Sequence, residues 1–448
     1  MEEHATKELV NLLEEKKLRE LRSRLISMNE ADIAIFLEEI GEVQALAVFR
    51  ILPKEIAAET FSFFAPETQE HIISSMTNAE TTEIVESLYI DDVVDMLEEL
   101  PANVVKKIMI NVDKDRRKII NQYLQYPEDS AGSIMTAEFI DFKKNVTVGE
   151  AINIIRKRGV DSESIYTCYI TDSSRKLEGF VSVRTLLVNS DDTKVEDLLE
   201  EDVLYVTTTD DQEYVARQFI KYGFLALPVV DHEKRLVGVV TFDDAVDILE
   251  EETTEDFEKM AAMAPSEKPY LKTSAVELSK NRIVWLMVLM ISATLTGFIL
   301  DKYEATFAAI PALVTFIPML TDTGGNAGSQ SSTMVIRGLS LGDIESKDIM
   351  KVWIKELVVS LMVGFVLSLA NFIRIVILRP GEYRLALTVS LSMYATVVLA
   401  KTIGGILPIA AKKMNFDPAI MAAPLITTIV DTVSLIVYFY IANGLLGL

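Results

Sequence analysis

The sequence contains very little cysteine and histidine. Its 448 residues include one cysteine, Cys168, and three histidines. A single cysteine excludes an intramolecular disulfide framework, and so few Cys and His side chains argue against a zinc site built from them. There is also no glycine-rich phosphate loop ending in Lys-Ser/Thr, which leaves no evident site for nucleotide hydrolysis. We therefore expect a protein that is not an enzyme.

A secretory signal is lacking as well, because MEEHATKELVNLLEEKK has no basic start followed by an apolar core. Charge is spread unevenly over the rest of the chain. The first 280 residues hold 31 basic and 57 acidic side chains, whereas the remainder holds 12 and 10. A strongly acidic half that stays in the cytosol is thus joined to a nearly neutral, apolar half. We expect no nucleic acid partner, since an acidic surface repels phosphates.

Five apolar stretches follow Asn281, and each is long enough to cross a bilayer as a helix at about 1.5 Å of rise per residue. They run over Ile283–Leu300, Ala305–Ile336, Val352–Leu378, Leu385–Ala411 and Ala419–Leu446. Eight Lys and Arg residues fall in the loops on the side of the N-terminal half, against four on the opposite side. The positive-inside rule then places the N-terminal domains in the cytoplasm and the C-terminus outside a prokaryotic inner membrane.

The second stretch is interrupted by polar and small residues, in the segment TDTGGNAGSQSS. Pro318, Gly324, Gly325 and Gly328 are expected to weaken a helix there and to free backbone carbonyls. Irregular backbone is tolerated at membrane depth only where it is buried in protein or lines a wet cavity. Carbonyls together with a carboxylate are ligands for a hard cation. The alternative is close packing, because small residues let helices approach one another.

Asp431 is the only charged residue from position 420 to the end of the chain, and it lies near the middle of the last apolar stretch. A carboxylate at that depth costs about 2.5–3.5 kcal/mol on insertion scales, so ionisable residues there are functional candidates by default. Thr427 and Thr428, about one turn earlier, would line the same route. Two alternatives stay open. Asp431 is structural, hydrogen-bonded or protonated, or it is neutralised by Lys401 or Arg374 of neighbouring spans.

Two stretches in the middle of the chain repeat each other. YITDSSRKLEGFVSVRTLL and PVVDHEKRLVGVVTFDDAV share the spacing from an aspartate to a glycine. Upstream of them, TVGEAINIIRKRG and DQEYVARQFIKYG match in length and pattern. Helix, strand, glycine turn, strand and helix are thus predicted twice. The repeat resembles a pair of cystathionine-β-synthase (CBS) domains, a regulatory α/β module that often binds adenine nucleotides.

In the CBS family a Ser/Thr-x-x-Asp element holds phosphate and ribose, and the second copy has it as Thr241 and Asp244. The first copy has Ser182, but Thr185 stands in the place of the aspartate. The resemblance implies ATP or another adenine nucleotide as a ligand, with a purely structural pair as the alternative. The candidate nucleotide residues are Tyr169, Ser182, Arg184, Thr241 and Asp244.

The chain before the repeat reads as short helices, such as ADIAIFLEEI, KEIAAETFSFF, TTEIVESL, DDVVDMLEEL and ANVVKKIM. Apolar residues recur at three- and four-residue intervals, and helices this short need to stack into a superhelix. After the repeat comes an acidic helix, DILEEETTEDFEKM. We place the domains at 1–131 (helical N-domain), 132–192 and 193–252 (CBS domains), 253–281 (connecting helix) and 282–448 (all-α transmembrane domain of five helices).

Most acidic surface residues simply keep a protein soluble. Nine carboxylates stand apart because they lie in three separate pieces that must pack together. A divalent cation between facing carboxylates would turn their repulsion into a bridge, and such sites are weak for Mg²⁺, which sheds water reluctantly. The candidate sensor residues are Glu59, Asp91, Asp95, Asp247, Glu250, Glu251, Glu255, Asp256 and Glu258.

Together, an acidic helical N-domain, a CBS pair, a connecting helix and five spans resemble the MgtE family of magnesium transporters over essentially the whole chain. The most specific segments are PMLTDTGGNAGSQSSTMVIRGLSLG and DPAIMAAPLITTIVDTVSL. The resemblance implies a homodimer in the lipid bilayer with a pore near the subunit interface. It also implies cytosolic domains that bind Mg²⁺ when it is plentiful and hold the pore closed, with a plug helix near Pro269–Lys280. The candidate pore residues are Asp431, Asn326, Thr427, Gly325 and Gly328.

The sequence thus predicts a Mg²⁺-selective, channel-like importer that is closed by cytosolic Mg²⁺. A proton-coupled divalent cation exchanger, with Asp431 as a proton relay, is one alternative, and it predicts flux that follows a pH gradient at zero voltage. A non-transporting membrane sensor whose CBS pair reads a nucleotide is the other, and it predicts no flux from the purified protein.

Overall fold

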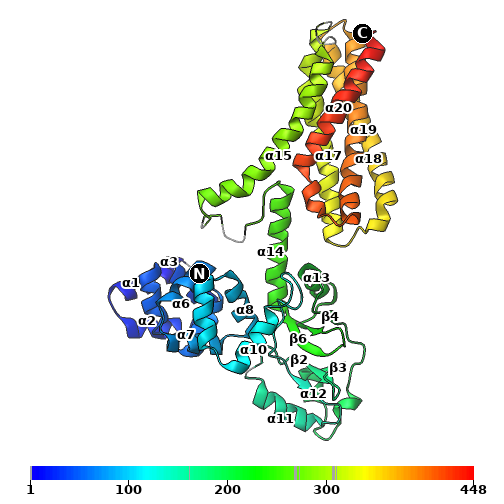
Figure 1. Cartoon of the computed structure of the whole chain (residues 1–448). Helices are drawn as coiled ribbons and strands as arrows, with labels where there is room; N and C mark the ends of the chain where they lie inside the picture. Colours follow the sequence, from blue (N-terminus) through cyan, green and yellow to red (C-terminus); the bar gives the residue numbers. More distant parts are fainter. Residues whose placement is uncertain are drawn as a thin grey trace. The chain divides into compact units, whose positions relative to one another are not determined.

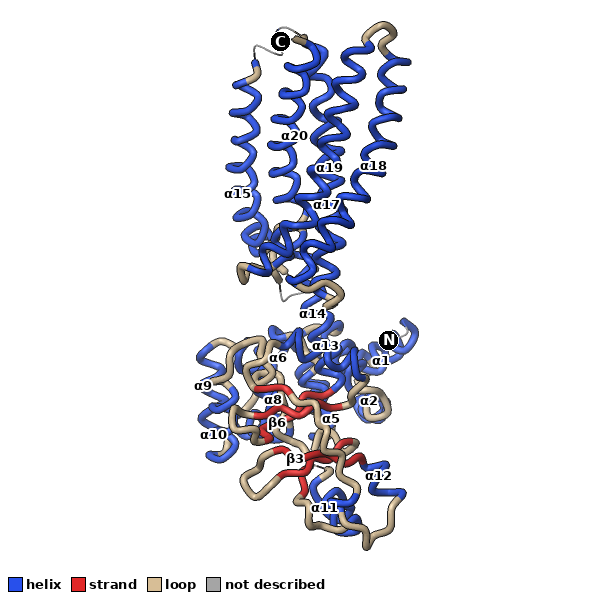
Figure 2. Tube along the Cα trace, turned by 90° about the vertical axis from the view of Figure 1, so that its right-hand side faces the viewer, coloured by secondary structure: helices blue, strands red, loops and turns tan. Residues whose placement is uncertain are grey.

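The computed structural model describes residues 3–160, 162–266, 270–271, 273–304, 308 and 310–447. By its contacts the chain divides into two compact units, Met1–Leu249 and Glu250–Leu448. The first unit holds short stacked helices followed by two small sheets (Figure 1). The second holds long apolar helices that run side by side (Figure 2).

Residues 3–123 form short helices, as the sequence pattern predicts. Their bounds are α1 Glu3–Glu14, α2 Leu18–Leu25, α3 Glu30–Glu39, α4 Glu42–Phe49, α5 Lys54–Ser62, α6 Pro66–Ser75, α7 Asn78–Ser87, α8 Ile90–Glu99, α9 Ala102–Asn111 and α10 Lys114–Tyr123. Several begin at a side-chain cap. Thr77, for example, accepts from the backbone N–H of Glu80, whose carboxylate accepts from the backbone N–H of Thr77. This reciprocal pair fixes the start of α7.

These helices stack in two alternating series. α3, α5, α7 and α9 contact one another in order, and α4, α6, α8 and α10 form the second series. Phe36, Phe49 and Phe61 are buried in the shared core, with the rings of Phe49 and Phe61 6.2 Å apart. Helices of about ten residues are marginal in isolation, so it is this stacking that holds them. The predicted superhelical N-domain is confirmed.

Two three-stranded sheets with the same topology follow. The first contains β1 Asp141–Phe142, β2 Thr167–Thr171 and β3 Leu177–Ser182, with helices α11 Val148–Arg158 and α12 Val183–Val188. The second contains β4 Val206–Thr207, β5 Ala226–Val230 and β6 Leu236–Thr241, with α13 Gln212–Tyr222 and the start of α14 Phe242–Met260. In each sheet the first two strands are parallel and the last two are antiparallel. The antiparallel register shifts at the end of the middle strand in both sheets, between Ile170 and Thr171 and between Val229 and Val230. The predicted CBS pair is confirmed.

The single cysteine lies inside the first of these sheets. Cys168 on β2 is fully buried, among Ile140, Ile170 and Val181. Burial raises the pKa of its thiol to about 12. The thiol therefore stays protonated and closed to reagents in the folded chain.

One helix, α14, leads out of the second CBS domain. It runs through residue 253 without interruption, so the boundary predicted there falls inside a helix. The next helix, α15 (Ala275–Lys302), begins at Ser274, whose hydroxyl accepts from the N–H of Glu277. Among the described residues of the plug predicted near Pro269–Lys280, the helical ones belong to α15. Residues 274–280 are the cap and first turns of α15, and Pro269 lies outside the described residues.

The second unit is a bundle of long helices: α15, α17 Ile317–Ser340, α18 Ile349–Leu378, α19 Tyr383–Lys413 and α20 Ala423–Leu446, with short turns η2 Pro311–Phe316, η3 Ser346–Asp348 and η4 Pro418–Met421. Within the described part of the chain, four helices are long and apolar enough to cross a membrane, namely α15, α18, α19 and α20. α17 has 24 residues and packs against α19 and α20, but it is more polar. A count of five spans stays a prediction.

The polar segment of α17 is helical throughout, which corrects the expectation of an interrupted helix. Its backbone carbonyls are engaged in the helix, and its small residues serve close packing instead. A Cβ added at Gly324 would lie 2.7 Å from Thr396 on α19, and one at Gly325 would lie 2.9 Å from Thr427 on α20. Only glycine fits at such distances, so this segment lets three helices approach one another.

A substitution at Gly404 tests this packing. A Cβ there would overlap the backbone carbonyl of Gly328 on α17, and neither backbone gives way without moving a helix. We expect Gly404→Ala to destabilise the bundle by about 1–3 kcal/mol and to lower its Tm. Gly297→Ala in α15 is the control, because nothing lies within 4 Å of its added Cβ. Thermal unfolding in detergent measures both variants, and equal Tm values would contradict the contact.

Candidate metal site and membrane path

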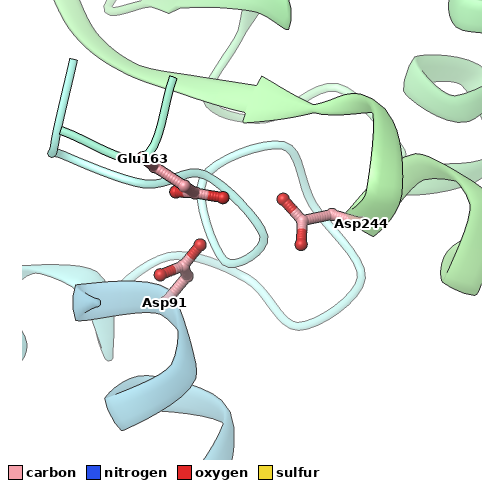
Figure 3. A group of neighbouring side chains, drawn as sticks. All are labelled: Asp91, Glu163 and Asp244. Carbon is pink, nitrogen blue, oxygen red and sulfur yellow. The ribbon is translucent and has the colours of Figure 1, made fainter. Parts of the chain in front are cut away.

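Three carboxylates from three parts of the first unit point toward one another (Figure 3). They are Asp91, Glu163 and Asp244, and one oxygen from each lies within 4.8 Å of the others. Asp91 is the second residue of α8, Glu163 belongs to the loop between α11 and β2, and Asp244 lies in the first turn of α14. This carboxylate group therefore joins the N-domain to both CBS domains.

Local structure fixes each member of the carboxylate group. Asp91 lies in the first turn of α8, where the helix macrodipole favours negative charge. Asp244 accepts the Thr241 hydroxyl at 2.5 Å and the Thr241 backbone N–H at 3.4 Å. The backbone N–H of Glu163 donates to the Glu138 carbonyl at 3.0 Å, which ties its loop to the segment before β1. The three side chains are thus presented by ordered backbone.

The charges that act most strongly on this group are all negative. Burial, then the charge of Glu163, raises the pKa of Asp91 well above its usual range. Burial, then the charge of Asp244, raises the pKa of Glu163 to about 8. Burial also raises the pKa of Asp244, although the bond from Thr241 opposes this. In the absence of a cation the group therefore holds a proton at neutral pH.

Two oxygens of the group lack a hydrogen-bond partner among the described residues. They are Asp91 Oδ1 and Glu163 Oε2, both inaccessible to solvent, and Asp91 as a whole is 8% exposed. Leaving buried carboxylate oxygens unsatisfied is costly. A divalent cation would satisfy both at once, and a ligand set made only of carboxylate oxygens, completed by water, suits Mg²⁺. The residues present thus fit a Mg²⁺ ion.

The other predicted sensor residues of the first unit are solvent-exposed. Glu59 lies on α5, Asp95 one turn after Asp91 on α8, and Asp247 one turn after Asp244 on α14. Of the nine predicted sensor carboxylates, the structure brings only Asp91 into the carboxylate group. Asp244 enters it although the sequence predicts a nucleotide ligand at that position.

The predicted sensor residues of the second unit lie on the rest of α14, where two are exposed, Glu250 and Glu251. Glu255 is occupied by an ion pair. Its carboxylate lies 2.5 Å from the ammonium of Lys259, which also contacts Asp417 at 2.8 Å. Lys259 thus stands between two carboxylates as an internal cation, and it holds the end of α14 against the segment that precedes α20.

Asp256 and Glu258 also have protein partners. The Ser340 hydroxyl at the end of α17 donates to Asp256 at 3.1 Å, and the Ser266 backbone N–H donates to Glu258 at 2.7 Å. Each carboxylate therefore already receives a hydrogen bond in this conformation. As metal ligands these two residues, with Glu255, stay predictions that compete with protein contacts.

Sequence reasoning missed Glu163, although a signal for it exists. The two CBS copies match from helix to strand, but Gly159 is followed by seven residues before β2, whereas Gly223 is followed by two before β5. The extra five residues of the first copy include the acidic segment DSES, which carries Glu163. An insertion in one copy of a repeat marks a feature that the duplicated fold does not need for itself.

The candidate nucleotide residues of the first CBS copy are only partly arranged for a ligand. Tyr169 is 1% exposed, and its hydroxyl has no partner among the described residues. Ser182 caps α12 by accepting from the Thr185 N–H at 3.0 Å, and the two hydroxyls lie 2.8 Å apart. Arg184 is exposed. Ser182 thus has its hydrogen-bond partner within the chain, in Thr185.

In the second copy, the Thr241 hydroxyl donates to the Asp244 carboxylate, so the two predicted nucleotide residues contact each other. This carboxylate nevertheless points toward Asp91 and Glu163 (Figure 3). Asp244 is therefore shared between a candidate nucleotide element and a candidate metal site.

In the second unit, the predicted pore residues lie on two neighbouring helices. Asp431 and Thr427 are half-buried on α20, and Asn326 is exposed on α17. Gly325 packs on Thr427, and the Thr427 hydroxyl donates to the Pro424 carbonyl at 2.9 Å. α17 and α20 thus bring these residues to one region, while their role as cation ligands stays a prediction.

The cations proposed as partners of Asp431 are engaged elsewhere. Lys401 is 5% exposed, and its ammonium lies 3.4 Å from the Ser331 hydroxyl, which donates to Glu356 at 2.5 Å. Arg374 donates at 2.9 Å to an asparagine one turn earlier on its own helix. These contacts do not support neutralisation of Asp431 by either residue.

Family models match most of the chain. A model described as "Divalent cation transporter" matches residues 317–441, and one described as "MgtE intracellular N domain" matches residues 28–129. The CBS domain model matches twice, at residues 131–191 and 195–251. The matched segments follow the order of domains described above.

Similar proteins cover the whole length. The magnesium transporter MgtE of Thermus thermophilus is 35% identical over 450 residues, which span 100% of this chain and 99% of that protein. The magnesium transporter MgtE of Bacillus subtilis is 31% identical over 97% of this chain and 96% of its own length. A solved structure, the cytosolic domain of the Mg²⁺ channel MgtE in complex with ATP, has a TM-score of 0.52 and 34% identity over 54% of this chain and 99% of that chain.

Proposed function

We propose that this chain, a member of the MgtE family of magnesium transporters, admits Mg²⁺ through a channel-like path at Asp431 and is closed by Mg²⁺ at the carboxylate group. Transport of Mg²⁺ by a multi-pass membrane protein follows from family membership. The path and the closing mechanism are our inference. The observation that carries the regulatory part is the convergence of Asp91, Glu163 and Asp244 from three domains.

The membrane potential alone can drive Mg²⁺ inward, so conduction needs no chemical energy. A divalent cation moving inward gains roughly 4.6 kcal/mol per 100 mV of inside-negative potential. Asp431 supplies a negative charge within the membrane-crossing helices. A Mg²⁺ ion that keeps most of its water shell there avoids a large dehydration cost. In a homodimer, which we infer from the family resemblance, two copies of Asp431 would face one ion.

Regulation follows from the electrostatics of the carboxylate group. Mg²⁺ bound there would supply two positive charges. Without them, Asp91, Glu163 and Asp244 repel one another, and the contact of α8 with the CBS pair is weakened. A ligand that binds the joined arrangement more tightly than the separated one shifts the population toward the joined arrangement, and the ratio of the two affinities limits the shift. We propose that the joined arrangement is the closed one, and that the N-terminal domains are cytoplasmic and the C-terminus is outside.

The CBS pair is proposed as a nucleotide site. The cytosolic domain of the relative named above was solved with ATP, and the Thr241–Asp244 element is formed here. Because Asp244 also belongs to the carboxylate group, nucleotide and Mg²⁺ would act on one another through this residue.

Mg²⁺ flux into liposomes tests the transport proposal. Purified protein is reconstituted, and an inside-negative voltage is imposed with no pH gradient. We expect Mg²⁺ uptake that scales with voltage and falls when Mg²⁺ is present on the side of the N-terminal domains. Flux that requires a pH gradient at zero voltage would support the proton-coupled exchanger instead. No flux under either condition would support the non-transporting sensor.

A further inference from the structure

One face of α17 is polar and exposed, although this helix packs among membrane-crossing helices. Asp322, Asn326 and Gln330 stand four residues apart, hence on one side of the helix, and all three are exposed. The opposite side is made of small buried residues that meet α19 and α20. Lipid offers no hydrogen-bond partners, so polar side chains at this depth need water or polar groups. The Gln330 side-chain carbonyl accepts from the buried Lys401 ammonium at 3.4 Å. The exposed carboxylate of Asp322 and the exposed amide of Asn326 fit a face that borders water.

The contacts between α17 and α20 fix the heights of Asp322 and Asp431 along the bundle. A Cβ at Gly324 would lie 2.9 Å from Val430 and 3.1 Å from Ser434, which sets the register of α17 against α20. Asp322 precedes Gly324 by two residues, and Asp431 directly follows Val430. The two residues therefore lie at similar heights along the packed helices. The negative charge of Asp322 acts on Asp431.

The direction of this register places Asp322 on one side of Asp431. Gly328 meets Ile426, whereas Gly324 meets Ser434, so the two helices run antiparallel. Earlier residues of α17 therefore lie toward the C-terminal end of α20. At this end of α17, Arg374 donates to the Met319 sulfur at 2.9 Å, and the Arg379 guanidinium lies 5.4 Å from the ring centre of Phe316. Asp322 has no basic partner in the described contacts.

We propose that Asp322 is a second carboxylate of the cation path, which captures hydrated Mg²⁺ from the side of the C-terminus before the ion reaches Asp431. The proposal rests on the proposed function. Attraction by a fixed charge grows with the charge of the ion, so Asp322 favours divalent over monovalent cations. A single charge about 8 Å from a divalent ion in a wet path changes its local concentration roughly fivefold. Asp322 thus sets the affinity for Mg²⁺ more than the maximal rate.

The concentration dependence of Mg²⁺ flux in liposomes tests the inference. We expect Asp322→Asn to raise the Mg²⁺ concentration at half-maximal flux about fivefold at low salt, with a maximal flux within about twofold of the wild type. The difference should shrink as ionic strength rises, because salt screens the charge. Asp301→Asn, at the exposed end of α15, is the matched control and should match the wild type.

A second variant holds the fold constant while the charge is changed. Asp322→Cys is treated with a thiol reagent that adds either a negative or a positive group, and the buried Cys168 stays unmodified. The negative group should restore the low half-maximal concentration, and the positive group should raise it further. Equal half-maximal Mg²⁺ concentrations with the two reagents would overturn the role of Asp322. If Asp431→Asn still abolishes flux in the same assay, the proposed function is unaffected. Absence of flux in the wild type would instead overturn the proposed function.

Discussion

Replacing Asp431 by asparagine should stop voltage-driven Mg²⁺ uptake into liposomes, with a loss of at least about 100-fold. The substitution keeps the size and the hydrogen-bonding capacity of the side chain and removes its charge. Within a low-dielectric bundle the attraction between a carboxylate and a divalent ion is worth several kcal/mol, and each 1.4 kcal/mol is about tenfold in occupancy. Flux of wild type and variant, measured in parallel at one imposed voltage, gives the ratio.

Two controls separate this result from a loss of structure. Asp301→Asn makes the same chemical change at the exposed end of α15 and should leave flux intact. Asp431→Asn should unfold at or above the wild-type temperature, because it removes a half-buried charge. Flux that persists in Asp431→Asn would leave a Mg²⁺ pathway in place and would make this residue structural.

Neutralising two members of the carboxylate group should blunt closure without reducing conduction. In Asp91→Asn with Glu163→Gln, we expect the Mg²⁺ concentration that halves flux from the cytosolic side to rise at least about tenfold, a loss of about 1.4 kcal/mol of binding. Mg²⁺ uptake by the double variant at low Mg²⁺ should match that of the wild type, since both residues lie in the first unit and the membrane-crossing helices lie in the second. Glu39→Gln, at an exposed carboxylate on α3 that is not a predicted sensor residue, is the control. Unchanged inhibition in the double variant would remove the carboxylate group from the regulatory account.

The same variant should change how stability depends on pH. Because the pKa of Glu163 is raised from 4.5 to about 8 in the folded state, the folded state binds a proton more tightly than the unfolded state does. In metal-free buffer, the wild-type unfolding free energy should therefore fall as pH rises from about 4.5 to about 8. Added Mg²⁺ should reverse that fall at pH 8. The double variant should show a flatter profile and little response to Mg²⁺ in thermal unfolding.

The fold is largely predictable from the sequence because its signals are local. Helical periodicity finds the short helices of the N-domain, and the repeat finds the CBS pair from two stretches that match each other. Runs of apolar residues find α15, α18, α19 and α20. α17 is predicted as a broken element because glycine weakens an isolated helix, yet Gly324 and Gly325 are tolerated since α19 and α20 surround them.

The site is less predictable because it depends on contacts between domains. Asp91 stands out as an acidic residue in a helix that must pack, but nothing in its own segment selects Glu163 or Asp244 as its neighbours. Glu255 shows the converse. Its place in an acidic helix predicts a metal ligand, and this stays a prediction. In the structure its carboxylate pairs with Lys259 four residues later, and only the further contact of Lys259 with Asp417 depends on the three-dimensional fold.

The CBS pair has an approximate internal symmetry, and the carboxylate group is built from the places where that symmetry fails. The seven-residue loop that carries Glu163 has a two-residue counterpart in the second copy, and Asp244 has Thr185 as its counterpart in the first. A perfectly duplicated pair would offer two equivalent surfaces to the single helix α8. Divergence of each copy at a different place leaves one surface that matches Asp91. The two similar CBS domains thus present one docking position for α8 per chain, and not two.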